Sequence, residues 1–114
     1  MRISRLAALL TGLAILVACG RSNPVLGDWE LDRGETEIGA VLAVQAAGLE
    51  HLAFSHDGVT AGDTAIGGSY VVEEGRVRFV RADGRGEHAI ELLADGRIGV
   101  DLPIGVRAVY RRAG

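Results

Sequence analysis

The sequence has no lysine, two prolines and one cysteine, Cys19, among its 114 residues. A lone cysteine cannot form a disulfide within its own chain, so the fold is not a disulfide scaffold. The protein must instead be held together by its apolar core and by the hydrogen bonds of its sheet. Its length suits a single small domain with a thin core.

The chain also lacks an apolar run long enough for a membrane helix at its N-terminus. Arg2 and Arg5 precede residues 6–18, which carry no charge. As a helix these residues would extend roughly 20 Å, whereas the hydrocarbon core of a bilayer is about 30 Å thick. A short basic segment followed by such a run is typical of an export signal.

The end of this run, the sequence LVAC at residues 16–19, resembles the lipobox of bacterial lipoproteins. The resemblance implies that residues 1–18 are a signal peptide that is removed, and that Cys19 is lipidated and anchors the chain in the cell envelope. Gly20 replaces the Asp that retains enteric lipoproteins in the inner membrane, which favours the periplasmic face of the outer membrane. Two alternatives remain open: a retained N-terminal helix, and a secreted protein cleaved near Cys19.

Positive charge is scarce in the rest of the chain. Without residues 1–18, ten arginines stand against fifteen acidic residues, a formal charge of −5. An acidic protein repels phosphate backbones, so the composition argues against nucleic acid as a partner.

Residues 19–26 are expected to form a lipidated linker, of which residues 20–26 reach at most about 25 Å. Residues 27–114 are expected to form one domain, because polar and apolar residues alternate there between turn signals. The turns are Asp57-Gly58, Glu74-Gly75, Asp83-Gly84 and Asp95-Gly96. The predicted strands are 27–31, one from His51, 69–73, 76–81, 87–93, 97–101 and 106–111. A Gly-rich connection is predicted at 62–68, and Pro103 is expected to end the sixth strand.

One helix of about twelve residues is predicted between the first two strands. Asp32, with Glu35 three residues later, forms a capping-box pattern, and Gly48 is a natural stop. Four apolar residues share one stripe of this helix: Ile38, Val41, Leu42 and Leu49. We expect the sheet or a membrane surface to cover the helix.

Short strands joined by Gly turns favour a mainly β fold. The prediction is a small antiparallel β-barrel of about seven strands, closed or nearly closed, with one helix between strands one and two. Closure would remove the exposed edges that invite aggregation.

Four short motifs support this fold: Gly27-Asp28-Trp29, Phe54 with Asp57-Gly58, Gly68-Ser69-Tyr70, and Val109-Tyr110-Arg111. Together with the early helix, they resemble the lipocalin-like (calycin-type) small barrels found among bacterial lipoproteins. The resemblance implies that Trp29 packs across the closed end of the barrel. It also implies that a late arginine, Arg111 or Arg112, stacks on Trp29 through a cation–π contact.

No residue pattern indicates catalysis or metal binding. His51 and His56 lack the spacing that would put them on one face, and His88 does not share a face with the acids on its strand. The Asp-Gly pairs suit turns and form no calcium loop. The sequence has no nucleophile elbow, P-loop or Cys/His pair. We therefore expect no catalytic residue, no metal, no cofactor and no enzyme activity.

Three hypotheses of function remain. The first is a non-catalytic envelope lipoprotein whose barrel binds another protein or an envelope component. The second is a lipocalin-type carrier of a small apolar ligand, and the third is an inhibitor of an exogenous enzyme. A cavity of roughly 300 Å³ or more would favour the carrier, whereas a filled barrel with an exposed polar loop would favour the binding module.

Overall fold

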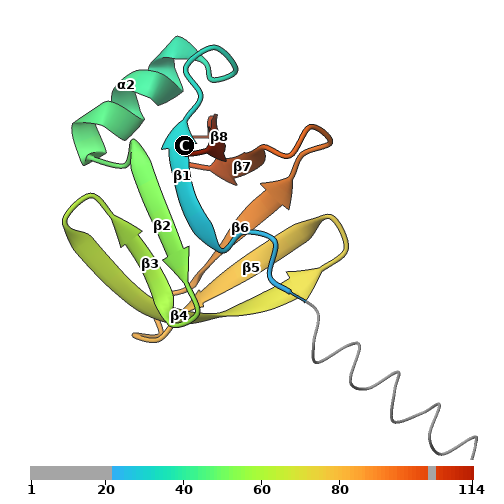
Figure 1. Cartoon of the computed structure of the whole chain (residues 1–114). Helices are drawn as coiled ribbons and strands as arrows, with labels where there is room; N and C mark the ends of the chain where they lie inside the picture. The colour runs from blue at the N-terminus through green and yellow to red at the C-terminus, as the bar shows by residue number, and fades with distance from the viewer. Residues whose placement is uncertain (1–21, 103–104) are drawn as a thin grey trace, which may run out of the picture.

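The computed structural model describes residues 22–102 and 105–114, and these residues form a closed antiparallel barrel (Figure 1). Each strand pairs with the next in the chain, and β8 pairs with β1 to close the barrel. The elements are β1 (Gly27–Leu31), α2 (Ile38–Ala47), β2 (His51–Ser55), β3 (Gly58–Ala61), β4 (Thr64–Glu73), β5 (Arg76–Arg81), β6 (Glu87–Leu92), β7 (Ile98–Asp101) and β8 (Arg107–Arg112). The predicted fold class, with its single early helix, is confirmed in the described residues, with eight strands instead of about seven.

The additional strand is β3, where no strand was predicted, and the predicted Gly-rich connection at residues 62–68 is also wrong. Most of residues 62–68 belong to β4, and the preceding β3 pairs with them, for example Val59 opposite Ile66. Gly68 is needed for packing within the strand: a Cβ there would lie 2.5 Å from the Phe79 ring. Gly68 therefore marks a close approach within a strand rather than a loop.

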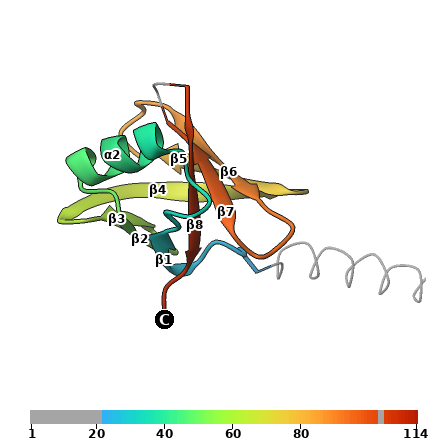
Figure 2. The same ribbon diagram turned by 90° about the horizontal axis from the view of Figure 1, so that it is seen from above.

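β4 is the longest strand, and it joins two parts of the barrel. Its first four residues pair with β3 and its last six pair with β5. Tyr70 stands opposite Phe79 and Val72 opposite Val77, which confirms the predicted pairing of this hairpin. Viewed from above, β4 runs across the molecule beneath α2 (Figure 2).

α2 is stopped at Gly48, as predicted, because this residue adopts the left-handed conformation at φ 72°. Of the predicted stripe, Val41 is buried and Leu49 is partly buried, but Ile38 and Leu42 are not. Ala40, Val41 and Val44 are buried, whereas Ile38 is 74% exposed and Leu42 is 60% exposed. Because the helix is apolar on nearly every side, its pattern does not select one face.

The buried face of α2 is selected by the loop that precedes it. Asp32 does not cap the helix, which begins at Ile38 without a side-chain cap. Instead one Asp32 oxygen accepts hydrogen bonds from the Gly34 and Glu35 amides, and the other accepts one from Arg97 Nε at 2.7 Å. Thr36 then fastens the loop to β8, where its hydroxyl bonds both the amide and the carbonyl of Val109.

The remaining boundaries shift by one or two residues, as is usual for strand ends. β7 ends at Asp101, and the predicted strand-ending role of Pro103 concerns a residue outside the described ranges. In the described part of the chain, no helix has the length and hydropathy needed to cross a bilayer.

Candidate functional site

The interior of the barrel contains an apolar cavity of about 210 Å³. It is only partly enclosed, and side chains from seven strands and from the segment after α2 line it. The lining residues are Leu49, Leu52, Phe54, Val59, Ala61, Ile66, Phe79, Arg81, His88, Ile90, Val100, Leu102 and Tyr110. The barrel is thus neither filled nor as roomy as the roughly 300 Å³ expected of a general carrier.

The lining side chains Phe54 and Phe79 are aromatic, and Tyr70, which does not line the cavity itself, packs against both. Tyr70 packs edge-on against Phe54, with ring centres 6.4 Å apart, and lies 5.2 Å from the ring centre of Phe79. The Tyr70 hydroxyl donates to the carbonyl of Gly58 at 2.7 Å. Burial raises the pKa of Tyr70 to about 12, so the hydroxyl keeps its proton and this hydrogen bond at neutral pH.

Two polar side chains, Arg81 and His88, interrupt the otherwise apolar lining. They flank the connection between β5 and β6, and His88 stands opposite the buried Phe79 in the ladder. Neither residue is marked by a local motif: His88 shares no face with the acids on its strand, and Arg81 stands alone in its strand pattern. A period of two through Val77 and Phe79 would have placed Arg81 on the interior-facing side.

The far end of the barrel is closed by Trp29, which is 2% exposed. Its indole Nε1 donates to the carbonyl of Val25 at 2.8 Å, and Val25 is fully buried in the core. Residues 25 and 26, which were expected to belong to the linker, thus pack against the core. The folded domain begins before Gly27, because the segment from Asn23 closes the barrel.

The arginine that stacks on Trp29 is Arg112. Its guanidinium carbon lies 4.2 Å from the centre of the Trp29 ring, and its nitrogens donate to the carbonyls of Leu26 and Pro24. Arg111, the other arginine that the resemblance allowed, points outward and pairs with Glu30 at 2.9 Å. Residues 110, 112 and 29 share the interior-facing rows of the paired strands, which places Arg111 on the other face.

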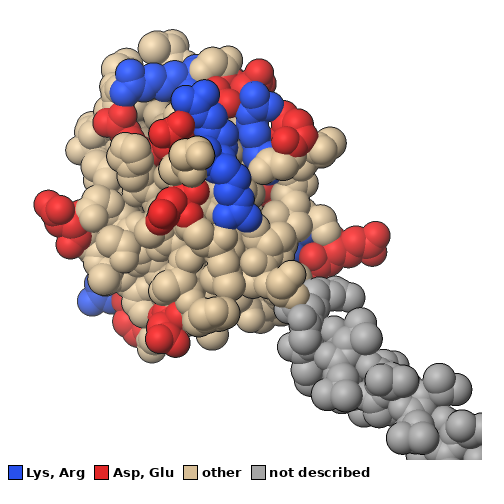
Figure 3. Space-filling model, in the orientation of Figure 1, with Lys and Arg blue, Asp and Glu red and all other residues tan. Residues whose placement is uncertain are grey.

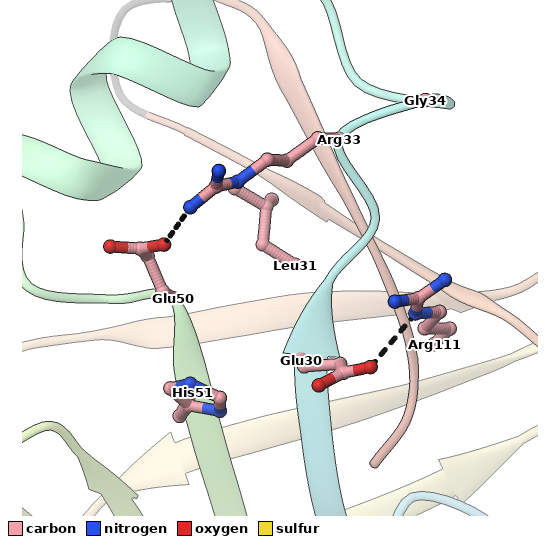
Figure 4. Close-up of a pocket in the computed structure, with 7 residues that line it drawn as sticks. All are labelled: Glu30, Leu31, Arg33, Gly34, Glu50, His51 and Arg111. Atoms are coloured by element: carbon pink, nitrogen blue, oxygen red, sulfur yellow. Dashed lines mark hydrogen bonds and ion pairs between the residues drawn. The ribbon is translucent and has the colours of Figure 1, made fainter. Parts of the chain in front are cut away.

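Arg111 and Glu30 border a surface groove of about 390 Å³ beside β1, β2 and β8 (Figure 4). A second ion pair, Arg33 with Glu50 at 2.7 Å, crosses the same groove. Arginines gather over the upper part of this face, next to acidic side chains (Figure 3). Within the groove, Arg33 pairs with Glu50 and Arg111 pairs with Glu30. Because these charges are paired, the groove offers an anion or a cation little net attraction.

The structure does not bring the histidines together. His51 begins β2 and His56 lies in the turn after it. His88 lies in β6, four strands away around the barrel. Within residues 22–102 and 105–114, no cluster of His, Cys, Asp or Glu is suited to hold a metal ion. Cys19 and the predicted signal peptide, residues 1–18, lie outside the described residues.

Comparison of the chain with protein-family models, with curated proteins and with solved structures gives no match in any of the three.

Proposed function

We propose that this protein is a non-catalytic envelope lipoprotein, anchored through Cys19, whose barrel binds a small apolar molecule. The observation that supports ligand binding is the partly open apolar cavity of about 210 Å³. An apolar cavity of about 150 Å³ is already large enough to bind benzene. A volume between that and a drug-sized site favours a small ligand over a bulky one.

The anchor rests on the sequence. Residues 16–19 resemble a lipobox, and the basic start and short apolar run before them suit an export signal. Two or three acyl chains hold a protein stably on a membrane, since each buried CH₂ contributes about 0.8 kcal/mol. The absence of Asp at position 20 supports the outer membrane, with the barrel on its periplasmic face.

Ligand binding can be tested by filling the cavity. The full chain in nanodiscs is titrated with fluorobenzene and followed by ¹⁹F NMR, with empty nanodiscs as the blank. Val59→Phe places extra carbon in the lining and should abolish the signal from bound ligand. Val71→Phe adds the same carbon at a position 39% exposed and should preserve it. Equal binding by both variants, or no binding by the unaltered chain, would refute the proposal.

A second candidate function is binding of an envelope protein through the outer face of α2. The observation that favours it is the exposure of Ile38 and Leu42, at 74% and 60%. Isolated exposed apolar residues are common, but this pair lies one turn apart on a helix whose outer face is mostly apolar. Capture from envelope extracts by the full chain, compared with Ile38→Ser/Leu42→Ser, tests this candidate, and equal capture by both would exclude it.

A further inference from the structure

The cavity is apolar except at one place. Arg81 ends β5 and His88 lies at the start of β6, so both flank the connection between these strands. Phe79 stands two residues before Arg81 and directly opposite His88, and its ring is 2% exposed. Arg81 and His88 therefore lie next to Phe79 in the lining. The cavity thus has an apolar interior, and its end at the connection between β5 and β6, which we call the rim, carries two polar side chains.

The Arg81 side chain is held in place. Its Nε and Nη2 donate to the two oxygens of Asp83, at 3.1 and 2.8 Å, and its side chain is 25% exposed. This pairing uses one edge of the guanidinium and does not involve Nη1. A guanidinium has five N–H donors, so an oriented Arg81 retains donors for a second acceptor.

The rim lies at one defined end of the barrel. In an antiparallel meander the connections alternate between the two ends. The connections after β1, β5 and β7 thus share an end, and the rim residues Leu49, Arg81 and Leu102 belong to these connections or adjoin them. The chain enters at the other end, which Trp29 closes.

We propose that the ligand of this cavity is a short amphiphile, with a carboxylate held at the rim by Arg81 and His88 and about eight carbon atoms in the barrel. This inference rests on the proposed function. The carbon number scales from benzene in about 150 Å³ to the 210 Å³ measured here. A planar carboxylate suits a guanidinium, and an imidazole N–H can donate to its second oxygen. With the anchored end opposite the rim, the ligand enters from water.

Three ligands separate the parts of this inference: octanoate, 1-octanol and hexadecanoate. The affinity of each ligand is measured by competition with fluorobenzene for the full chain in nanodiscs of neutral lipid. Free ligand concentrations are calibrated on empty nanodiscs. Octanoate should bind about tenfold more tightly than octanol, as expected for one hydrogen bond to a charged group. Hexadecanoate should gain no affinity from its additional carbons.

Variants locate the effect. Arg81→Gln should remove the preference for octanoate. Arg81→Lys keeps the charge without the planar fork and should retain only part of the preference. Asp83→Asn should increase it by removing a competing carboxylate. Arg85→Gln removes the same charge from the same connection at an exposed residue outside the lining, and should leave the preference unchanged.

The outcomes separate this inference from the proposed function. If fluorobenzene binds but octanoate and octanol bind equally, the carboxylate assignment is wrong and the apolar site stands. Equal losses in Arg81→Gln and Arg85→Gln would also overturn the assignment, since they would indicate a diffuse charge effect. If fluorobenzene itself does not bind, the proposed function fails.

Discussion

The guanidinium of Arg112 covers the indole of Trp29 at 4.2 Å and at the same time binds the carbonyls of Leu26 and Pro24. One side chain at the end of β8 thus joins the first strand to the segment that precedes it. The indole reaches the same segment through its own hydrogen bond to Val25. The closed end of the barrel is therefore a junction between the start of the domain and the end of β8, which lie 86 to 88 residues apart in sequence.

Trp29→Ala should destabilise the protein by about 3–5 kcal/mol, because it removes the largest buried side chain of a small core. Since Trp29 is the only tryptophan, the native fluorescence should be short in wavelength and poorly quenched by acrylamide. Denaturant unfolding of the full chain measures the loss. Red-shifted, easily quenched emission with an unchanged midpoint would mean that Trp29 is a surface residue.

Arg112→Gln and Arg111→Gln form a matched pair of adjacent substitutions with the same charge change. Arg112→Gln should cost about 1–2 kcal/mol, because it removes the cation–π contact and two hydrogen bonds. Arg111→Gln removes only an exposed ion pair and should cost under about 0.5 kcal/mol. Thermal unfolding ranks the two variants, and the reverse order would contradict the assignment of Arg112 to the closed end.

Gly68→Ala should destabilise the barrel, because the new methyl group would lie 2.5 Å from both the Phe79 ring and the carbonyl of Val80. We expect a cost of about 1–3 kcal/mol, typical of overpacking. Gly39→Ala is the control, since it meets open space within α2 and should stabilise the protein by about 0.5–1 kcal/mol. A neutral Gly68→Ala would show that β4 and β5 are not packed this closely.

Asp32 should make the fold sensitive to acid. Burial alone would raise the pKa of Asp32, but the hydrogen bond and charge of Arg97 and the amides of Glu35 and Gly34 outweigh it and lower the pKa. A lowered pKa gives stability that is complete above the unfolded value of about 3.9 and is lost as pH falls through the folded value.

Asp32→Asn should therefore destabilise the protein at pH 7, and its deficit relative to the unaltered chain should shrink below about pH 4. Arg97→Gln should show the same trend, because it removes the main group that stabilises the ionised carboxyl. Urea unfolding at a series of pH values measures both variants. A deficit for Asp32→Asn that is constant from pH 7 to pH 3 would rule out this role.

Cys19→Ser should abolish membrane association, because the serine hydroxyl cannot replace the thiol in lipidation. Fractionation of cells and the mass of the purified chain measure this outcome. A Cys19→Ser protein that stays in the membrane fraction at the size of the unaltered protein would show that the lipoprotein proposal is wrong.

The sequence predicted what depends on local pattern. Alternation and Asp-Gly or Glu-Gly turns located the hairpin of β4 and β5, and Gly48 located the end of α2. It did not predict what depends on distant partners. Asp32 matches a capping box, yet it binds Arg97, 65 residues away, and the helix begins later.

The same limit applies to the candidate site. Trp29 was assigned to the closed end because the resemblance to lipocalin-like barrels implies that position. The choice between Arg111 and Arg112 needed the register of β8 against β1, which the sequence alone does not give. Arg81 was missed because its role depends on a cavity, and a cavity depends on how the side chains of opposite strands fill the barrel.

Because residues 23–26 pack against the closed end, a lipid anchor at Cys19 would lie closer to the barrel than the predicted linker implies. A linker of residues 20–26 would have reached about 25 Å, whereas residues 20–22 extend at most about 11 Å. A chain lipidated at Cys19 would thus hold its barrel against the lipid headgroups. The distance that the protein extends from the membrane would then be set by the size of the barrel, not by the linker. Any molecule that meets α2 would have to come within one small domain's thickness of that membrane.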